Sequence, residues 1–430
     1  MAIRGKETLH VVMTAALLAM TNAAHGAGFY SPSVGTPGSL GTAGVANPTN
    51  TRNPDAAWTN PAGMTGVDAQ HLMSGFQLLL PSVKFDAQSV QNTAVLPNRL
   101  GPVRGGNGGN AGDVVSVPSF FYVRPLSDRA RFGFSTVAPL GGGVDYGKDF
   151  VGRYAVRDVQ LAGIGFTPSF AYRLTDKLSL GAGVSAIYTT LDQSIAIRQG
   201  APDPATDGRV KFDNLDDWGF QGILGLTYAF SDRLLLGVVY RSETDTDLKG
   251  DVNYRNLRNP DLASLLPSDV KISWKNPQWF EAGLRYRLND RTELYLNLGW
   301  QEWSKFSNNV LSFSGGTVAE LDRNWDDTWH AGIAAAYALT PSSGVSLGVA
   351  YESSPVKDKY RTLDFPVDKT WRLSAAYGWK HGDNLAFALG TTVSLFGDSA
   401  LEESAQSVTV RGKFDSNFLV VVGGNLRYHF

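Results

Sequence analysis

Residues 418–430 read FLVVVGGNLRYHF and bring the chain to its end on an aromatic residue. Alternate residues of a β-strand point to opposite faces of a sheet, so this stretch divides into two faces. One face stays apolar throughout, whereas the other becomes polar through Asn425, Arg427 and His429. An amphipathic strand that stops on Phe430 is typical of the last strand of a bacterial outer-membrane barrel.

The same alternation recurs along most of the preceding chain. In its clearest example, Leu294, Leu296 and Leu298 share one face and follow the tight turn Asn289-Asp290. We predict strands at residues 71–85, 116–126, 130–138, 158–173, 177–198, 217–230, 232–254, 269–288, 290–313, 326–339, 343–354, 364–380, 383–397 and 407–430. Their number is even, as in single-chain bacterial barrels. The sequence therefore predicts an all-β, 14-stranded antiparallel transmembrane β-barrel over residues 71–430.

The connections between these strands differ in length at the two ends of the predicted barrel. Short turns such as Thr175-Asp176, Ser231-Asp232 and His381-Gly382-Asp383 alternate with longer polar loops. Outer-membrane barrels have short periplasmic turns and long extracellular loops. The asymmetry therefore supports the barrel and gives its orientation.

The first 26 residues have the pattern of a secretory signal peptide. Arg4 and Lys6 precede a short apolar run, and small residues at Ala24 and Gly26 suit cleavage before Ala27. The alternative, a membrane anchor, is disfavoured because a spanning helix needs about 20 apolar residues. We expect an exported chain whose mature form begins at Ala27.

The composition agrees with a membrane barrel and excludes other classes. Charged residues make up 18% of the chain, below the roughly 25% of soluble domains. The 22 Phe, 16 Tyr and 10 Trp suit the aromatic girdles at the two membrane interfaces. A net charge of −2 argues against a nucleic-acid partner, and the absence of cysteine excludes disulfides and a cysteine-linked lipid anchor.

No motif for a cofactor, a metal or catalysis stands out. The glycine-rich stretch at 101–112 does not lie between a strand and a helix, so we interpret it as a mobile surface loop rather than a nucleotide-binding loop. The acidic run at 213–217 is interpreted as a solvated loop rather than a cation site. The histidines outside the signal peptide have no recognisable catalytic context. We therefore expect neither a cofactor nor an enzyme.

Residues 27–70 differ from the rest because they are rich in Gly, Pro, Ser, Thr and Asn and show no sustained period. A disordered tail is one interpretation. The other is a hatch inside the barrel, because fourteen strands enclose a lumen too wide for side chains alone to fill. Phe29, Trp58 and Met64 lie in this segment and favour the hatch.

Several short motifs follow one another in a distinctive order. They are NPDAAWTNPAGM at 53–64 with its Asn60-Pro61-Ala62 core, AYRL at 171–174, YRSE at 240–243, WSKF at 303–306 and NWDDTW at 324–329. In this order and spacing they resemble the FadL/TodX family of outer-membrane channels for hydrophobic compounds. The resemblance covers residues 27–430. One departure is Glu352, where the family usually carries the shorter acid.

The resemblance implies passive transport across the outer membrane of a Gram-negative bacterium. Ligand would be captured between extracellular loops, enter a barrel closed by the hatch, and leave sideways through a gap at a kinked third strand. The implied partners are hydrophobic small molecules (long-chain fatty acids or aromatic hydrocarbons), outer-membrane lipid and lipopolysaccharide, and the barrel-assembly machinery, which would bind Phe430.

The third predicted strand contains a basis for such a kink. Pro139 lacks a hydrogen-bond donor, and Gly141, Gly142 and Gly143 leave no side chains to pack. The alternative is an ordinary loop that begins where the strand ends at Ala138. The family resemblance favours the kink.

Candidate ligand contacts come from the hatch and from two loops. Asn259-Pro260-Asp261 predicts a helix start that places Leu262, Leu265 and Leu266 on one apolar face. The hatch would contribute Phe29, and the other loop is expected at residues 199–217.

A fatty-acid carboxylate needs a cation, for which Arg198 and Lys305 are the candidates. Val310 stands where the resemblance leads us to expect a second basic residue. This departure favours a neutral ligand such as a monoaromatic hydrocarbon. A general water-filled porin for small polar solutes remains the alternative function.

Overall fold

The structure is a computed structural model that describes residues 34, 36–94, 101–306, 308–316 and 318–430. The predicted signal peptide and Phe29 lie outside these residues. Within the described chain, no helix is both long and apolar enough to cross a membrane.

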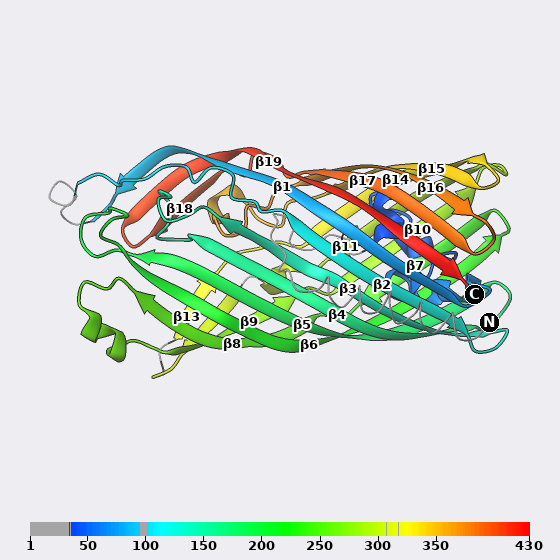
Figure 1. The fold of residues 1–430 in the computed structure, drawn as a ribbon, viewed down its shortest axis with the longest axis horizontal. Coiled ribbons are helices and arrows are strands. Elements are labelled where there is room, and N and C mark those ends of the chain that lie inside the picture. The colour runs from blue at the N-terminus through cyan, green and yellow to red at the C-terminus, as the bar shows by residue number, and fades with distance from the viewer. Residues whose placement is uncertain (1–33, 35, 95–100, 307, 317) are drawn as a thin grey trace.

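The described strands form one antiparallel sheet that closes on itself (Figure 1). Strand β1 (His71–Asn92) closes the ring because it pairs with both β2 (Val115–Pro125) and β19 (Val408–His429). The remaining strands are β3 (Ala130–Asp145), β4 (Asp158–Arg173), β5 (Leu178–Ile197), β6 (Gly208–Ser231), β7 (Leu234–Arg241), β8 (Thr244–Arg255), β9 (Asp269–Asn276), β10 (Trp279–Arg287), β11 (Thr292–Gln301), β12 (Asn308–Phe313), β13 (Val318–Asp322), β14 (Thr328–Thr340), β15 (Ser343–Glu352), β16 (Thr370–His381), β17 (Leu385–Leu395) and β18 (Leu401–Ala405).

Five pairs of these segments are successive parts of single barrel strands. They are β7 with β8, β9 with β10, β11 with β12, β13 with β14, and β17 with β18. In each pair, the two segments follow one another along the same neighbouring barrel strand. The 19 segments therefore make a closed barrel of 14 strands, which confirms the predicted fold.

Several predicted boundaries were wrong where the alternation of side chains breaks. Strand β6 begins at Gly208, so much of the predicted 199–217 loop is barrel wall. A bulge there leaves both Phe212 and Leu215 buried, which reverses the alternation and hides the strand. The predicted strand 269–288 is interrupted after Asn276, where Pro277 has no donor for the ladder.

The outer surface of the barrel is apolar. Phe220, Trp329 and Leu389 are 60–66% exposed, and many other large apolar side chains face outward beside them. Such a surface is stable only against lipid, so it marks the membrane-spanning band. The turns at 174–177, 288–291 and 382–384 all lie at the end that carries the C-terminus (Figure 1).

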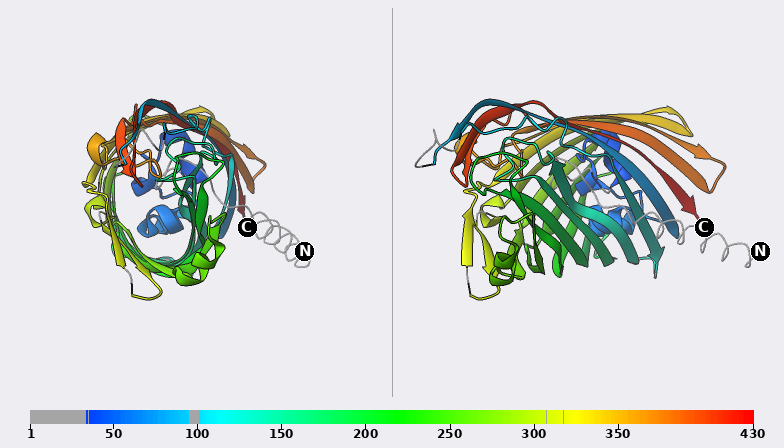
Figure 2. Two further views of the ribbon diagram at one scale, coloured as in Figure 1. Left: turned by 90° about the vertical axis from the view of Figure 1, so that its left-hand side faces the viewer. Right: turned by 60° about the vertical axis from the view of Figure 1, so that its left-hand side comes forward.

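Residues 36–70 lie inside the ring of strands, where Figure 2 shows them as the blue segment. They fold into η2 (Pro37–Thr42), η3 (Asn47–Thr49), α2 (Ala56–Thr59) and η4 (Pro61–Gly66). Asn60 begins η4 by accepting a hydrogen bond from the Ala62 N–H at 3.1 Å, and Pro61 suits the first helical position. Short helical turns explain why this segment has no strand period.

The lumen at the end with long loops is filled by one apolar cluster. The cluster draws on strands from all round the barrel and on the β3–β4 connection, through Phe85, Phe150, Leu215, Trp274 and Phe414. This apolar filling gives the lumen two regions, an apolar outer half and an inner half that contains residues 36–70.

Candidate ligand path and wall interruption

Five aromatic side chains gather in the outer half of the lumen. We call Trp274, Trp303, Phe306, Trp325 and Phe365 the aromatic cluster. Its ring centroids lie 4.7 Å apart for Phe306 and Trp325 and 4.8 Å apart for Trp274 and Phe306. Rings at these separations form a continuous, polarisable apolar surface.

One ion pair borders the aromatic cluster. The Arg323 guanidinium lies 4.6 Å from the Phe365 ring centre, and its Nη2 is 2.7 Å from Asp364 Oδ2. Burial favours the neutral acid, but Arg323 outweighs it and holds the pKa of Asp364 below its usual range. Arg323 is therefore already neutralised within the cluster.

A second carboxyl lies beside this pair, in the loop region outside the membrane band. Glu403 Oε2 accepts a hydrogen bond from the Leu363 N–H at 2.8 Å. Burial, followed by the charge of Asp364, raises the pKa of Glu403 to about 8. When Asp364 and Glu403 are both ionised, two carboxylates thus lie beside the single guanidinium of Arg323.

The barrel wall is interrupted between β2 and β3. The ladder between them ends at Phe120 and Thr136, although β2 continues to pair with β1 as far as Val115 and β3 with β4 as far as Asp145. Within the described strands, residues 115–119 and 137–145 therefore have no ladder with each other. We call this stretch the β2–β3 interruption.

Pro139 lies in a bulge at the start of the interruption. Val137 pairs with Gly165 and Leu140 with Gly163, so β3 carries one extra residue here. Residues Gly141, Gly142 and Gly143 pair with β4, so they are strand and not the alternative loop. Pro139 is tolerated because the β2 side offers no acceptor that its missing N–H would serve.

Apolar side chains border both edges of the interruption. Val115 and Val117 on β2, and Leu140 and Val144 on β3, are at most 3% exposed and belong to the apolar cluster of the outer lumen. The apolar interior therefore extends to the wall at this point.

Residue Ala111 lies at the far end of the interruption and forms main-chain hydrogen bonds there. Its N–H donates to Val83 O of β1, and its carbonyl accepts from the Asp145 N–H of β3, both at 2.8 Å. Part of the 101–112 stretch is therefore packed into the wall. The prediction of a mobile surface loop was wrong here because Ala111 supplies the pairing that β2 does not.

Arginines of the wall hold the inner segment by its main chain. Arg131 Nε donates to Val67 O at 2.7 Å, and Arg241 donates to Trp58 O. Three more side chains make the same kind of contact: Arg173 to Thr65 O, Arg285 to Thr49 O and Arg427 to Arg52 O. We call these five the arginine clamp.

Glycines of the wall let the segment approach closely. A Cβ added at Gly181 would lie 2.8 Å from Ala62 Cα, and one added at Gly348 would lie 2.7 Å from Thr42 Cα. Gly225 and Gly237 also approach main-chain atoms of the segment, whereas Gly133, Gly332 and Gly423 approach its side chains. At the four glycines that meet main-chain atoms, the wall and the inner segment therefore pack main chain to main chain, without room for a side chain between them.

A family model for outer membrane protein transport proteins (OMPP1/FadL/TodX) matches residues 17–430. The chain belongs to this family. It is 22% identical over 385 residues to a long-chain fatty acid transport protein of Salmonella typhi, covering 84% of this chain and 86% of that one. It is also similar to outer membrane protein P1 of Haemophilus influenzae, with 22% identity over 413 residues and 88% of each chain covered.

Solved structures share the fold. A Pseudomonas aeruginosa FadL homologue has a TM-score of 0.85 with 21% identity, over 94% of this chain and 99% of that one. The Pseudomonas putida toluene transporter TodX has a TM-score of 0.65 with 17% identity, over 88% of this chain and 94% of that one. As a FadL/TodX protein, the chain is an outer-membrane transport channel of a Gram-negative bacterium and not an enzyme.

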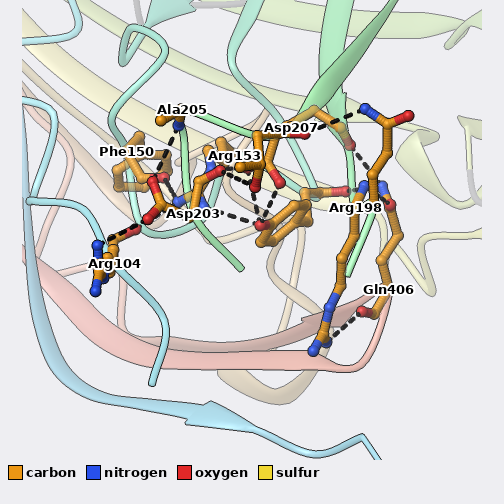
Figure 3. Close-up of polar contacts among 12 residues, drawn as sticks. Arg104, Phe150, Arg153, Arg198, Asp203, Ala205, Asp207 and Gln406 are labelled. Atoms are coloured by element: carbon orange, nitrogen blue, oxygen red, sulfur yellow. Dashed lines mark hydrogen bonds and ion pairs between the residues drawn. The ribbon is translucent and has the colours of Figure 1, made fainter. Parts of the chain in front are cut away.

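The two candidate cations are placed differently in this FadL/TodX barrel. Arg198 donates to the carbonyl oxygen of Gln406 (Figure 3). It also donates to the carbonyl oxygens of Gly200 and Ser407 and to Asn92 Oδ1, and all four distances are 2.9–3.2 Å. Its guanidinium thus joins loops to one another. Lys305, in η6 (Trp303–Phe306), is exposed beside the aromatic cluster, with no ion-pair partner among the described residues.

The predicted loop helix is present as η5 (Pro260–Leu265), and Asn259 Oδ1 accepts from the Asp261 N–H at 3.1 Å. Leu266 is 39% exposed, and the side chains of Leu262 and Leu265 lie outside the described set. Val310 pairs with Glu320 between β12 and β13.

A buried ion pair ties the extracellular loops together. Arg153 Nε lies 2.7 Å from Asp207 Oδ2, and the two side chains are 1% and 4% exposed (Figure 3). Arg153 Nη1 also donates to Arg104 O, and the Tyr154 hydroxyl donates to Asp207. Segments 104, 150–154 and 207 therefore form one cap over the lumen.

Sequence reasoning missed the arginine clamp. The sequence pattern that accompanies the clamp is an arginine two residues away from a glycine on the inward face of a strand, as in Arg131 with Gly133 and Arg285 with Gly283. Inward arginines in outer-membrane barrels usually contact solvent. The pattern therefore indicates a clamp only once the inner segment is known to lie inside the barrel.

Proposed function

We propose that this chain takes up hydrophobic compounds from outside the cell and releases them sideways into the outer membrane. Ligand is captured by the extracellular loops, moves along the apolar outer lumen and leaves through the β2–β3 interruption. The hatch is residues 27–70, which precede the barrel at residues 71–430 in the sequence. It stays inside the barrel during release. Removal of residues 1–26 as a signal peptide is part of the same proposal.

The β2–β3 interruption is the observation that carries this proposal. Its edges, Val117 and Leu140 among them, belong to the apolar cluster of the lumen, and the outer surface of the barrel faces lipid. A route along these side chains is apolar from lumen to membrane. A hydrophobic ligand on this route never has to enter a polar, water-filled channel.

The arginine clamp supports a hatch that stays in place. A hydrogen bond from a charged donor contributes about 1.5–3 kcal/mol, and five such donors grip one short segment. Ejecting the hatch for every ligand would require breaking all of them together. Lateral release needs none of these bonds to break.

Two ligand classes remain in the proposal, because relatives and structural neighbours are named for each: long-chain fatty acids and toluene. Asp364 already neutralises Arg323 beside the aromatic cluster, which favours a neutral ligand, whereas exposed Lys305 suits a carboxylate. Further proposed partners are lipopolysaccharide around the barrel and the barrel-assembly machinery at Phe430.

Uptake of labelled oleate and labelled toluene tests the function directly. Cells that lack their own channel of this kind would express the chain, and each label would be followed in parallel. Entry of either compound supports hydrophobic transport, and the ratio identifies the ligand. Entry of neither compound, together with leakage of small sugars, would make the chain a general porin.

Deletion of Pro139 tests the lateral route. Removing the one extra residue of the bulge restores the register with β4 and leaves the other side chains on their faces. We expect β3 to pair with β2 further along and uptake to fall by at least tenfold. Pro139→Gly keeps the bulge and serves as the matched control. Normal uptake by a folded deletion variant would exclude this route.

A further inference from the structure

A cavity lies at the opposite end of the lumen from the aromatic cluster. It has a volume of about 580 Å³ and lies between the inner segment at Arg52 and Asn53 and the wall from β10 to β19. The turns at 289–291 and 340–343 line its mouth, so it faces the periplasm. Its size is within the range of small-molecule sites.

Small residues on neighbouring strands create this space. Ala336 and Ala338 on β14, Gly344 and Ser346 on β15, Ala376 and Gly378 on β16, and Ala386 and Ala388 on β17 line the cavity. The cavity therefore has an apolar floor that suits a small hydrocarbon or aromatic group.

The rim of the cavity is basic. Arg52, Arg287, Arg291, Lys380 and Arg427 line it, and the only acidic residues in the same lining are Asp290 and Glu293. Like charges gathered around one cavity raise its free energy unless an anion neutralises them. The cavity thus has an excess of positive charge.

The half-buried acid in this lining, Glu293, is already shared between two of these cations, since Arg287 Nε lies 3.8 Å from its Oε1 and Arg52 binds it directly. Glu293 accepts two hydrogen bonds from Arg52, at 2.6 and 2.7 Å, and a third from the Tyr295 hydroxyl at 2.8 Å. Arg427 donates to neutral oxygens of residues 52 and 53. Arg291 and Lys380 are exposed and form no ion pair with any residue that the structure describes.

We propose that this cavity is a periplasm-facing binding site for a small organic monocarboxylate. The carboxylate would lie between Lys380 and Arg291, and the hydrocarbon part would lie on the alanine and glycine floor. Exposed lysine and arginine side chains adjust to a carboxylate without unpairing the Arg52–Glu293 contact. The site is separate from the lateral route and does not depend on it.

Benzoate and benzyl alcohol provide a direct test, because they share a size and differ in charge. Binding to the full-length protein in a nonionic detergent would be measured by ligand-observed NMR at low salt. We expect benzoate to bind roughly fivefold to tenfold more tightly than benzyl alcohol, the effect of a few partly exposed charge contacts. Raising the salt concentration should remove this preference.

A double variant and a matched control locate the site. Lys380→Gln with Arg291→Gln removes two cations from the rim and should abolish the preference for benzoate. Lys369→Gln with Arg411→Gln makes the same charge change at the extracellular end and should leave the preference intact. Equal binding of the two probes to the unaltered protein, or an unchanged preference in the rim variant, would overturn the proposal.

Discussion

The guanidinium of Arg241 on the barrel wall lies 4.2 Å from the centre of the Trp58 indole ring and donates a hydrogen bond to the Trp58 carbonyl. Both residues are buried, and 183 positions separate them in the chain. One side chain thus binds the main chain and the ring of the same hatch residue. This contact joins the wall to the inner segment at α2, near the middle of the described residues 36–70.

Arg241→Gln should loosen the hatch and let small polar solutes leak. A charged hydrogen bond contributes about 1.5–3 kcal/mol and a cation–π contact about 0.5–2 kcal/mol, and the variant loses most of both. Planar-bilayer conductance and sugar permeation into liposomes would measure the leak. Arg124→Gln, at an exposed position on β2, is the control and should stay closed. Equal conductance in both variants would contradict a clamping role.

Gly181→Ala should destabilise the protein by about 1–3 kcal/mol, because the new methyl group collides with main-chain atoms of Ala62 in the hatch. Gly222→Ala on neighbouring β6 is the matched control, since its nearest atom would be 3.7 Å away. Thermal unfolding of both purified variants checks this. If the two midpoints fall together, close packing of hatch on wall is not the cause.

Asp207→Asn should cost about 3–5 kcal/mol, because it leaves the buried Arg153 charge without its partner. Arg104→Gln removes the neighbouring pair with Asp203, in which Arg104 is 73% exposed, and should cost at most about 1 kcal/mol. Limited proteolysis of loop 199–207 would compare them. Equal protection of the loop in both variants would show that the buried pair does not hold the cap.

Ionisation of Glu403 should make the folded protein less stable as the pH rises. Burial and Asp364 raise the folded-state pKa of Glu403 to about 8 from 4.5, so the folded protein holds this proton more tightly than the unfolded chain. This contribution is fully present below pH 4.5 and is lost as the pH rises through 8, at about 1.4 kcal/mol per unit at most.

The groups around Glu403 set the design of this experiment. The negative charge of Asp364 disfavours ionisation of Glu403, whereas the Leu363 N–H and Arg323 favour the ionised form of Glu403. Unfolding midpoints between pH 5 and 8.5 should fall for the unaltered protein and stay level for Glu403→Gln. A parallel fall in both proteins would assign the pH dependence to other groups.

Lys305→Ala should lower oleate uptake several-fold and leave toluene uptake unchanged, because only the fatty acid carries a carboxylate for this exposed cation. Arg198→Ala should instead lower both, since it removes the hydrogen bonds that join loops at Asn92, Gly200 and Gln406. Parallel uptake assays distinguish the two effects. Loss of toluene uptake in Lys305→Ala would exclude a carboxylate-specific role.

The alternation of apolar and polar residues was sufficient to predict the barrel, its strand number and the exact bounds of β4 at residues 158–173. Alternation is a local property, and lipid outside the barrel enforces it on every strand. It failed at the bulge before Leu215, where one extra residue exchanges the two faces. The place of the third-strand irregularity was predicted because proline and glycine mark it directly, but its continuation to Asp145 was not.

The sequence by itself thus determined the class of fold, the strand count and the outer-membrane location, and it marked Pro139 as a point where the third strand is irregular. Only the tertiary structure decided that β2 stops pairing with β3 beyond Phe120, that Ala111 frames the interruption, and that Arg241 grips Trp58. These contacts join residues far apart in the chain. Their partners are set by how the strands stagger around the closed ring and how the hatch packs inside it, and no local pattern encodes either.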